Sequence, residues 1–418
     1  MTLIADPPEH RSSRLVPSLL SRREFRRYWG GHTVSLFGDQ ISLLAIPLLA
    51  VLTAHATPAQ MGYLTAAGLV PYLLFSLIAG AWADRRSDKR RLMIIADVGR
   101  AAALIAVPVM YISGVLSLTI LYAVAFVVGT LSVLFSVCDN TLFASLVDKD
   151  EYVEANTLLN GSRAMSFVAG PSAAGLLVQI FNAPLAILTD AISYLCSAFM
   201  LGRIRPVEPA GATGAGWGIS EGLRFIAHHR VLRTLLAATT TLNLFSYIYS
   251  ALFVLYVTRT LGVSPGALGV VLGAASSGAL LGAAATKPLV RKLGIGRAYV
   301  FSQILFPAPL LLVPLASGGT STILTLLFVA EFLSGAGVMV LDITVGSLMT
   351  AATPDMLRAR IAGAQRTINY GIRPIGALIG GFLGTTIGVH NTLWIGAAGA
   401  VLGVLCLIGS PIPRMREI

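Results

Sequence analysis

The feature that most constrains the fold is a repeat of charged and proline residues inside apolar segments. Three pairs of residues lie 203 positions apart: Asp139 and Asp342, Arg163 and Arg366, and Pro171 and Pro374. Charges are rare in lipid-embedded helices because taking a charge out of water is costly. The same costly residues in the same register indicate a membrane protein built from two similar halves in tandem.

Twelve apolar segments divide the chain, and we expect each to be a membrane-spanning helix. A soluble domain carries roughly 25% charged residues, whereas this sequence of 418 residues carries 12% and is 55% hydrophobic. The expected spans are 28–52, 59–82, 92–113, 117–142, 155–180, 184–201, 232–260, 266–289, 297–316, 321–349, 359–387 and 391–412. Most approach or exceed the roughly 20 residues that cross a bilayer. The expected fold class is therefore an all-α integral membrane protein with two pseudo-symmetric six-helix bundles.

Basic residues predict the orientation of these spans. Of the 30 lysine and arginine residues, four lie within the spans, 25 fall on the side of the N-terminal tail, and only Arg259 falls at an opposite end. Because cytoplasmic loops carry the excess of basic residues, we expect both termini to be cytoplasmic. The net charge of +11 is then explained by membrane topology, and no nucleic-acid partner is expected.

A central polar segment predicts the division between the two bundles, because it is rich in glycine and proline. The expected units are a cytoplasmic tail over 1–27, a first bundle over 28–201, a cytoplasmic linker over 202–231, a second bundle over 232–412 and a cytoplasmic tail over 413–418. A short helix is expected in the linker, from about Trp217 to His229. Its apolar residues would lie on the membrane surface, or the helix is an ordinary connection.

The loop after the second span carries a motif of known type. Gly80, Asp84 and Arg85 are followed by the basic run 89–91. This pattern resembles the loop motif after the second helix of the major facilitator superfamily. The equivalent place in the second half, at Thr286, lacks the acid.

Further segments narrow the resemblance to one branch of that superfamily. They resemble the drug-exporter branch that includes macrolide-efflux and enterobactin-exporter proteins, and they are 25–29, 38–39, 154–156, 170–171 and 358–363. The arginine that many drug exporters carry in the fourth helix has no counterpart between 116 and 139.

The resemblance implies a twelve-helix fold with a central cavity that opens alternately to either side. It implies a secondary transporter, and we expect proton-coupled export of a small amphipathic molecule such as an antibiotic or siderophore. The alternatives are uptake by proton symport, movement of lysolipid, and a non-transporting membrane sensor or intramembrane enzyme. The expected partners are a small-molecule substrate, protons and membrane lipid, and we expect a monomer that is not an enzyme. No ATP-binding loop, cofactor motif or metal-ligand cluster occurs in the sequence.

Three charged residues are expected near the middle of the membrane: Asp39, Glu331 and Arg373. Burial disfavours the charged form of a lone carboxylate, so such a group can take up a proton on one side and release it on the other. Asp39 is the first candidate for proton coupling or for a cationic substrate group, and the alternative is a structural hydrogen bond to a neighbouring helix. Glu331 is either a second proton or substrate site or the partner of Arg373.

Six further charged residues are expected to form a cytoplasmic gate: Asp84, Arg85, Asp139, Arg163, Asp342 and Arg366. The helix ends that carry the last four would meet when the cavity opens outward. Two arrangements stay open for them. Cross-half pairs, Asp139 with Arg366 and Asp342 with Arg163, would act as a gate, whereas within-half pairs would brace each bundle.

The seventh span carries polar side chains on one helical face. Asn243, Tyr247 and Ser250 are spaced by four and three residues, which places them on the same side of a helix. They either line the cavity or pack against a neighbour. Asp97 and Arg100 are one turn apart in the third span and are expected to pair locally as structural support.

Overall fold

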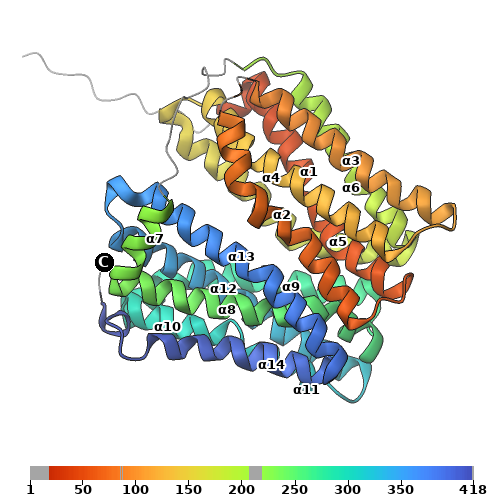
Figure 1. Ribbon diagram of the computed structural model, residues 1–418. Helices are drawn as coiled ribbons and strands as arrows, with labels where there is room; N and C mark the ends of the chain where they lie inside the picture. The colour runs from red at the N-terminus through yellow and green to blue at the C-terminus, as the bar shows by residue number, and fades with distance from the viewer. Residues whose placement is uncertain (1–17, 85, 87, 207–218, 417–418) are drawn as a thin grey trace, which may run out of the picture.

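The computed structural model describes residues 18–84, 86, 88–206 and 219–416, and helices dominate this part of the chain (Figure 1). The first half contains α1 Arg23–Leu52, α2 Pro58–Asp84, α3 Lys89–Ile112, α4 Leu118–Leu146, α5 Tyr152–Phe181 and α6 Ala183–Gly202. The short helix α7 Ile219–His228 follows. The second half contains α8 Arg230–Leu255, α9 Pro265–Leu293, α10 Ile295–Leu305, α11 Leu312–Leu315, α12 Thr320–Ala352, α13 Arg358–Thr386 and α14 Val389–Val401.

Ten helical segments of the described chain are long and apolar enough to cross a membrane. They contain α1, α3, α4, α5, α6, α8, α9, α10 with α11, α12 and α14. The remaining two expected spans correspond to α2 and α13, which are helices of 27 and 29 residues. Arginine residues at four positions lower the mean hydropathy of α13: Arg358, Arg360, Arg366 and Arg373.

Several helix boundaries differ from the sequence prediction. The expected span 297–316 is interrupted, because α10 ends at Leu305 and a 3-10 turn at Ala308–Leu311 separates it from α11. Pro307 and Pro309 lie at this break, and proline removes a backbone donor and clashes with the preceding turn. The expected span 391–412 also changes from α-helix to 3-10 helix, because α14 ends at Val401 and a 3-10 segment, Leu402–Leu407, follows it.

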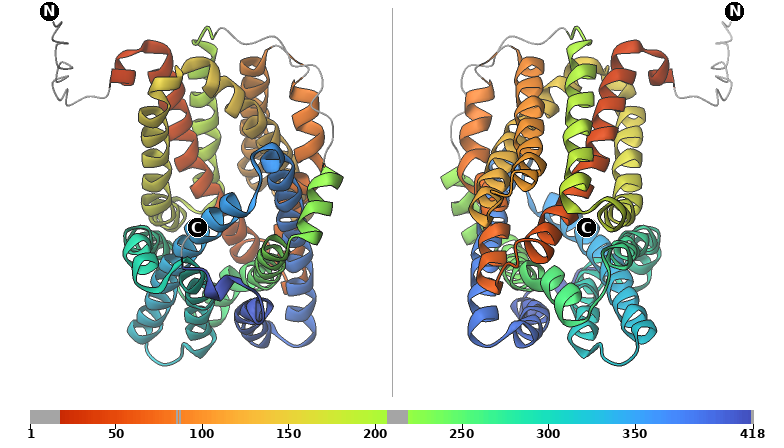
Figure 2. Two further views of the ribbon diagram at one scale, coloured as in Figure 1. Left: turned by 90° about the vertical axis from the view of Figure 1, so that its left-hand side faces the viewer. Right: turned by 90° about the vertical axis from the view of Figure 1, so that its right-hand side faces the viewer.

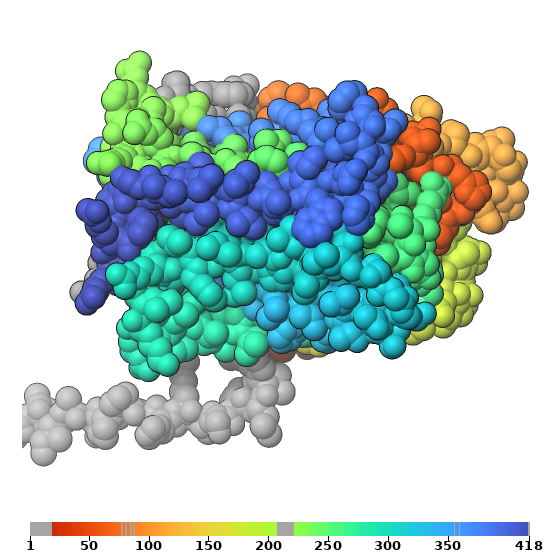
Figure 3. All heavy atoms as spheres, turned by 90° about the horizontal axis from the view of Figure 1, so that it is seen from below, coloured from red at the N-terminus to blue at the C-terminus, as the bar shows by residue number. Residues whose placement is uncertain are grey.

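The two halves use the same pattern of helix contacts. In the first half α1 packs on α5 and α6, while α2 and α3 pack on α4. In the second half α8 packs on α13 and α14, while α9 and α10 pack on α12. This repeated packing agrees with the 203-residue spacing of the buried charges. In the view from below, the second half fills most of the visible surface and the first half appears at its right-hand edge (Figure 3).

The halves touch most closely at one end, here called the far end, which carries the loops 53–57 and 113–117. There α2 packs on α13 and α5 packs on α9. A Cβ atom on Gly62 would lie 2.7 Å from the backbone oxygen of Ala377, and one on Gly175 would lie 2.3 Å from that of Pro265. Glycine at these positions therefore permits direct contact between helix backbones.

One cation also joins the two halves at the far end. The Arg259 guanidinium donates to the backbone oxygens of Ala56 and Val51, at 2.9 and 2.8 Å. The opposite end, here called the linker end, carries α7 and the C-terminal segment. The two halves diverge toward this end (Figures 1 and 2). The molecule is thus closed at the far end and open at the linker end.

The linker helix α7 belongs to the second half. A Cβ atom on Gly222 would lie 2.5 Å from the backbone oxygen of Arg360, at the start of α13. Glu221 forms an ion pair with Arg360, and Ile226 packs with Ile361 and neighbouring apolar residues. The helix is thus attached to α13, while Trp217, expected on the membrane surface, lies outside the described residues.

The close helix contact at the far end predicts that a larger side chain at Gly62 pushes the two helices apart. Gly62→Val should separate α2 from α13, because the colliding atoms belong to the backbone of α13 and cannot rotate away. Spin labels at the exposed positions Thr57 and Thr386 should report a longer distance by pulsed electron resonance. Gly68→Val on the same helix is the control, since a Cβ atom there has nothing within 4 Å. An unchanged distance in Gly62→Val would contradict this account of the closed end.

Candidate functional site

The first half contains a buried polar cluster between α1, α3 and α6. The Tyr194 hydroxyl on α6 donates to the Asp39 carboxylate on α1, at 2.6 Å. The Arg100 guanidinium on α3 lies 4.0 Å from the centre of the Tyr194 ring and 4.5 Å from that of Phe135. Arg100 also forms an ion pair with Asp97, one turn earlier on α3. The expected local pair therefore exists, and Tyr194 joins it to Asp39.

Asp190 is a member of this cluster that the sequence analysis missed. It is fully buried on α6 and accepts hydrogen bonds from Ser42 on α1 and from Ser193, the latter at 3.0 Å. Gly38 makes the approach possible, because a Cβ atom there would lie 2.3 Å from an Asp190 carboxylate oxygen. Asp190 could have been found from the sequence, because it is the single acidic residue of the apolar span 184–201.

The charges of this cluster do not balance when every group is ionised. Three carboxylates, Asp39, Asp97 and Asp190, share one guanidinium, Arg100. One oxygen of Asp97 is buried and has no hydrogen-bond partner in the described part of the chain. Because an uncompensated buried charge is costly, this composition favours the binding of protons or of another cation.

The second half presents a basic and aromatic group at the equivalent depth. Arg373 on α13 donates through Nε to the side-chain oxygen of Asn243 on α8, at 2.9 Å. Its guanidinium lies 4.3 Å from the ring centre of Tyr370 and 5.3 Å from that of Tyr247. Asn243 in turn donates to Asn369 at 3.4 Å. We refer to these five residues as the arginine site.

The polar face expected on the seventh span is only partly joined to this site. Asn243 and Tyr247 both contact Arg373, whereas Ser250 is exposed and takes no part.

A stacked pair of rings, Tyr72 on α2 and Tyr370 on α13, connects the two halves with centroids 5.9 Å apart. Sequence reasoning missed both rings, because neither lies in a motif.

Glu331 and Arg373 do not pair in this structure. Arg373 hydrogen bonds to Asn243 instead, and within residues 18–416, apart from the undescribed positions, no ion pair of Glu331 is found. Tyr249 on α8 is its polar neighbour, and the buried Tyr249 hydroxyl also has no hydrogen-bond partner among the described atoms. The alternative in which Glu331 neutralises Arg373 is therefore not realised in this conformation.

The residues expected to form the gate lie apart at the open linker end. Asp139 accepts a hydrogen bond from Tyr28 at 2.8 Å and lies 3.9 Å from His32. The other three are exposed on α5, α12 and α13, and they are Arg163, Asp342 and Arg366. Neither the cross-half nor the within-half ion pairs occur among the described residues. The Asp84 side chain and Arg85 lie outside the described residues, so the gate stays a prediction.

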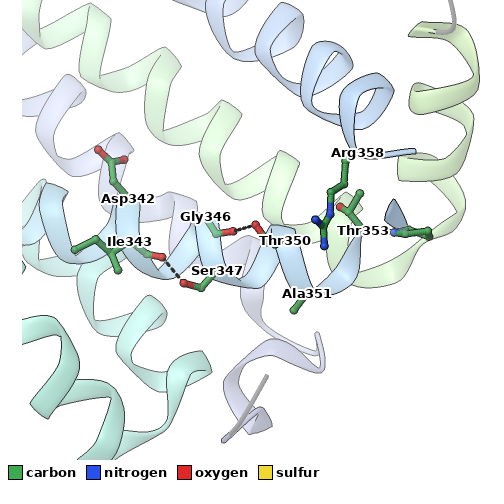
Figure 4. A pocket seen from close by; sticks show the side chains of 9 residues that line it. Asp342, Ile343, Gly346, Ser347, Thr350, Ala351, Thr353 and Arg358 are labelled. Carbon is green, nitrogen blue, oxygen red and sulfur yellow. Dashed lines mark hydrogen bonds between the residues drawn. The ribbon is translucent and has the colours of Figure 1, made fainter. Parts of the chain in front are cut away.

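A cavity of about 910 Å³ opens along α12 at the linker end. It extends from Asp342 past Ser347 and Thr350 to Arg358 at the start of α13 (Figure 4). Asp342 and Arg358 lie near its opposite ends, and Arg358 projects toward α12 (Figure 4). The cavity wall therefore combines polar and apolar side chains and contains charges of both signs.

Comparisons with known proteins agree with this architecture. The chain matches the transmembrane secretion effector family over residues 13–418. It is 27% identical over 401 residues to the uncharacterized MFS-type transporter YfiS of Bacillus subtilis, covering 92% of this chain and 93% of the relative. It is 28% identical over 408 residues to the multidrug efflux pump Tap of Mycolicibacterium fortuitum, covering 91% and 93%.

A solved structure shows the same fold. The inward-facing structure of a bacterial homologue of the iron transporter ferroportin has a TM-score of 0.75 at 16% identity, covering 92% of this chain and 98% of that chain. The fold and the matches together define a transporter of the major facilitator superfamily, a multi-pass protein of the bacterial inner membrane that moves a small molecule. Within that superfamily, the chain belongs to the transmembrane secretion effector family.

The buried pair on α3 predicts an asymmetric effect on stability. Asp97→Ala should remove the carboxylate that forms the direct ion pair with the buried Arg100, and breaking a buried pair costs roughly 3–5 kcal/mol. The apparent melting temperature in detergent should fall clearly. Asp148→Ala, which removes a carboxylate that is 77% exposed, should change it little because exposed pairs contribute little. Equal losses in both variants would contradict a stabilising role for the Asp97–Arg100 pair.

Proposed function

We propose that this chain is a proton-coupled exporter of a small amphipathic molecule that works by alternating access. It would have twelve spans, with α2 and α13 included, and cytoplasmic termini. The linker end would then face the cytoplasm, and the structure would be open inward. The observation that carries the proposal is the excess of carboxylates over guanidinium groups in the buried cluster around Asp39.

The cluster is well placed to couple a proton to a change of conformation. Its carboxylates lie on α1, α3 and α6, so a change in their charge alters the contacts between helices of one half. Tyr72 connects the cluster with the second half, because its hydroxyl lies within electrostatic range of Asp39 and its ring stacks on Tyr370. Proton uptake at Asp39 would therefore bias contacts that cross the interface.

The similarity to Tap supports the direction of transport. Tap is named a multidrug efflux pump, and more than nine-tenths of both chains is aligned. We extend export to this chain as part of the proposal. Uptake by symport would use the same cluster with the opposite direction of substrate flow, so the measurement must establish direction as well as coupling.

Coupling predicts a dye response in inverted membrane vesicles. Addition of a transported antibiotic or siderophore should collapse an imposed proton gradient, as followed by a pH-sensitive dye, because protons leave the vesicle in exchange. Asp39→Asn should abolish this response, since the amide cannot carry the proton. Asp148→Asn, an exposed acid outside the cluster, should keep it. Accumulation of a labelled compound without any loss of the gradient would contradict proton coupling.

We also propose that the gate residues pair when the linker end closes. In a variant without native cysteines, Asp139→Cys combined with Arg366→Cys should crosslink poorly when the linker end is open. The yield should rise when Gly62→Val holds the far end apart, since opening one end closes the other. A yield that does not depend on conformation would favour bracing within each half.

A further inference from the structure

We propose that the arginine site binds an anionic group of the transported molecule, so that the substrates are amphipathic organic anions that carry an aromatic ring. This inference rests on the proposed export function and names its substrate class. It differs from the expectation from sequence, which placed a cationic substrate group at Asp39.

The guanidinium of Arg373 is held in place but not neutralised. Its Nε hydrogen bonds to Asn243, and Asn243 is itself held by the backbone oxygen of Thr239 at 2.8 Å and by Asn369. Among the described residues, the hydrogen bond of Arg373 is made by Nε, and its two terminal nitrogens make none. A neutral amide orients the group without cancelling its charge. The Arg373 guanidinium is therefore fixed in orientation, and its two terminal nitrogens stay available to a ligand.

The charged groups around Arg373 leave room for an external anion. Asp342 on α12 lies within electrostatic range of Arg373, yet the two residues form no ion pair. On α8, the residues that touch Arg373 are the uncharged Asn243 and Tyr247. A charge at this depth is costly unless it has a partner, so an anion from the substrate would supply the missing interaction.

The arginine site faces the open end of the molecule. Side chains on a helix lean toward its N-terminus, and α13 begins at the linker end, so Arg373 is directed toward that end. Asp342, its electrostatic neighbour, lines the cavity along α12. Arg373 is itself half-buried and does not line this cavity, so we infer that a molecule entering from the linker end would approach Arg373 past Asp342.

The surroundings specify the chemistry of the bound group. A guanidinium binds a carboxylate through two parallel hydrogen bonds, which a lysine ammonium cannot reproduce. Tyr247, Tyr370 and the stacked Tyr72 add aromatic surface beside the cation, and offset or edge contacts between rings are favourable. A carboxylate attached to an aromatic system satisfies both features at once.

The positions of the first half that correspond to Arg373 and Asn243 carry no arginine and no asparagine. This difference argues that Arg373 is not a packing residue that both bundles need. Subtracting the 203-residue spacing from Arg373 and Asn243 gives Gly170 and Gln40. There the glycine lets the glutamine pack closely, because a Cβ atom on Gly170 would lie 2.5 Å from that of Gln40. The bundle thus packs at this position without a cation, and Arg373 is an addition specific to the second half.

The test compares two dyes that share a ring system but differ in charge. Binding of anionic fluorescein and of cationic rhodamine 6G to the purified full-length protein in nanodiscs is measured by fluorescence polarisation. Wild-type protein should bind fluorescein, and the affinity should fall as salt is added. Arg373→Gln should weaken fluorescein binding at least tenfold and leave or improve rhodamine binding. Arg373→Lys should weaken it less, because the charge remains while the paired donors are lost.

Two further variants separate a binding role from a general loss of structure. Arg291→Gln removes an exposed arginine in the last turn of α9, outside the proposed gate and the arginine site, and should leave fluorescein binding unchanged. Asn243→Ala should weaken it moderately, because Arg373 loses the group that orients it. Absence of fluorescein binding to the wild-type protein, or equal binding to Arg373→Gln, would overturn the inference. Asp39→Asn separates this inference from the proposed proton coupling. The variant should lose coupling but keep fluorescein binding in the absence of a gradient.

Discussion

The exclusion of charge from lipid determines where the functional groups of this protein are located. A charge that lies deep in the helices is costly unless a partner stabilises it. In the first half this requirement draws α1, α3 and α6 together, because Arg100 is surrounded by Asp97 and two aromatic rings while Tyr194 binds Asp39. The polar cluster is thus also a structural element. In the proposed mechanism, a change in its protonation would alter the contacts that hold these helices in place.

The contact between the helices of the two halves depends on small residues, to which Arg259 adds a charged group that hydrogen bonds to backbone oxygens. At the far end, Gly62 meets Gly381 and Gly175 meets Gly269 with backbone against backbone. Such contacts are close but have no interlocking side chains, and interfaces of this kind are common where membrane helices pack through small residues. These contacts close the far end. When that end opens, the helices can separate without breaking many interactions between side chains.

The sequence predicted the helices better than the connections among their side chains. Long apolar segments identified every helix of the two halves, and the prolines at 307 and 309 explain why one of them is broken. The site was predicted in part. Asp39, Asn243 and Arg373 were identified from depth and helical spacing, but Asp190 was not, since its partner Ser42 lies 148 positions away in the chain. No local pattern encodes which distant helix neutralises a buried charge.

The two halves repeat the same packing but not the same chemistry. Adding the 203-residue spacing to the acids of the first half, at Asp39 and Asp190, leads to Leu242 and Leu393. The position equivalent to Arg100 is Gln303, which is buried and donates to the Tyr299 hydroxyl at 2.7 Å.

A neutral hydrogen bond thus replaces an ion pair, and the polar cluster has no copy in the second half. The arginine site has no copy in the first half either. Two halves with identical buried polar groups would respond identically to a proton, whereas these halves differ in their buried polar groups. Under the two proposals, the excess of acid in one half and the unneutralised arginine in the other would allow a proton and an organic anion to bind to separate halves. The stacked rings of Tyr72 and Tyr370 would then connect the two binding events across the interface.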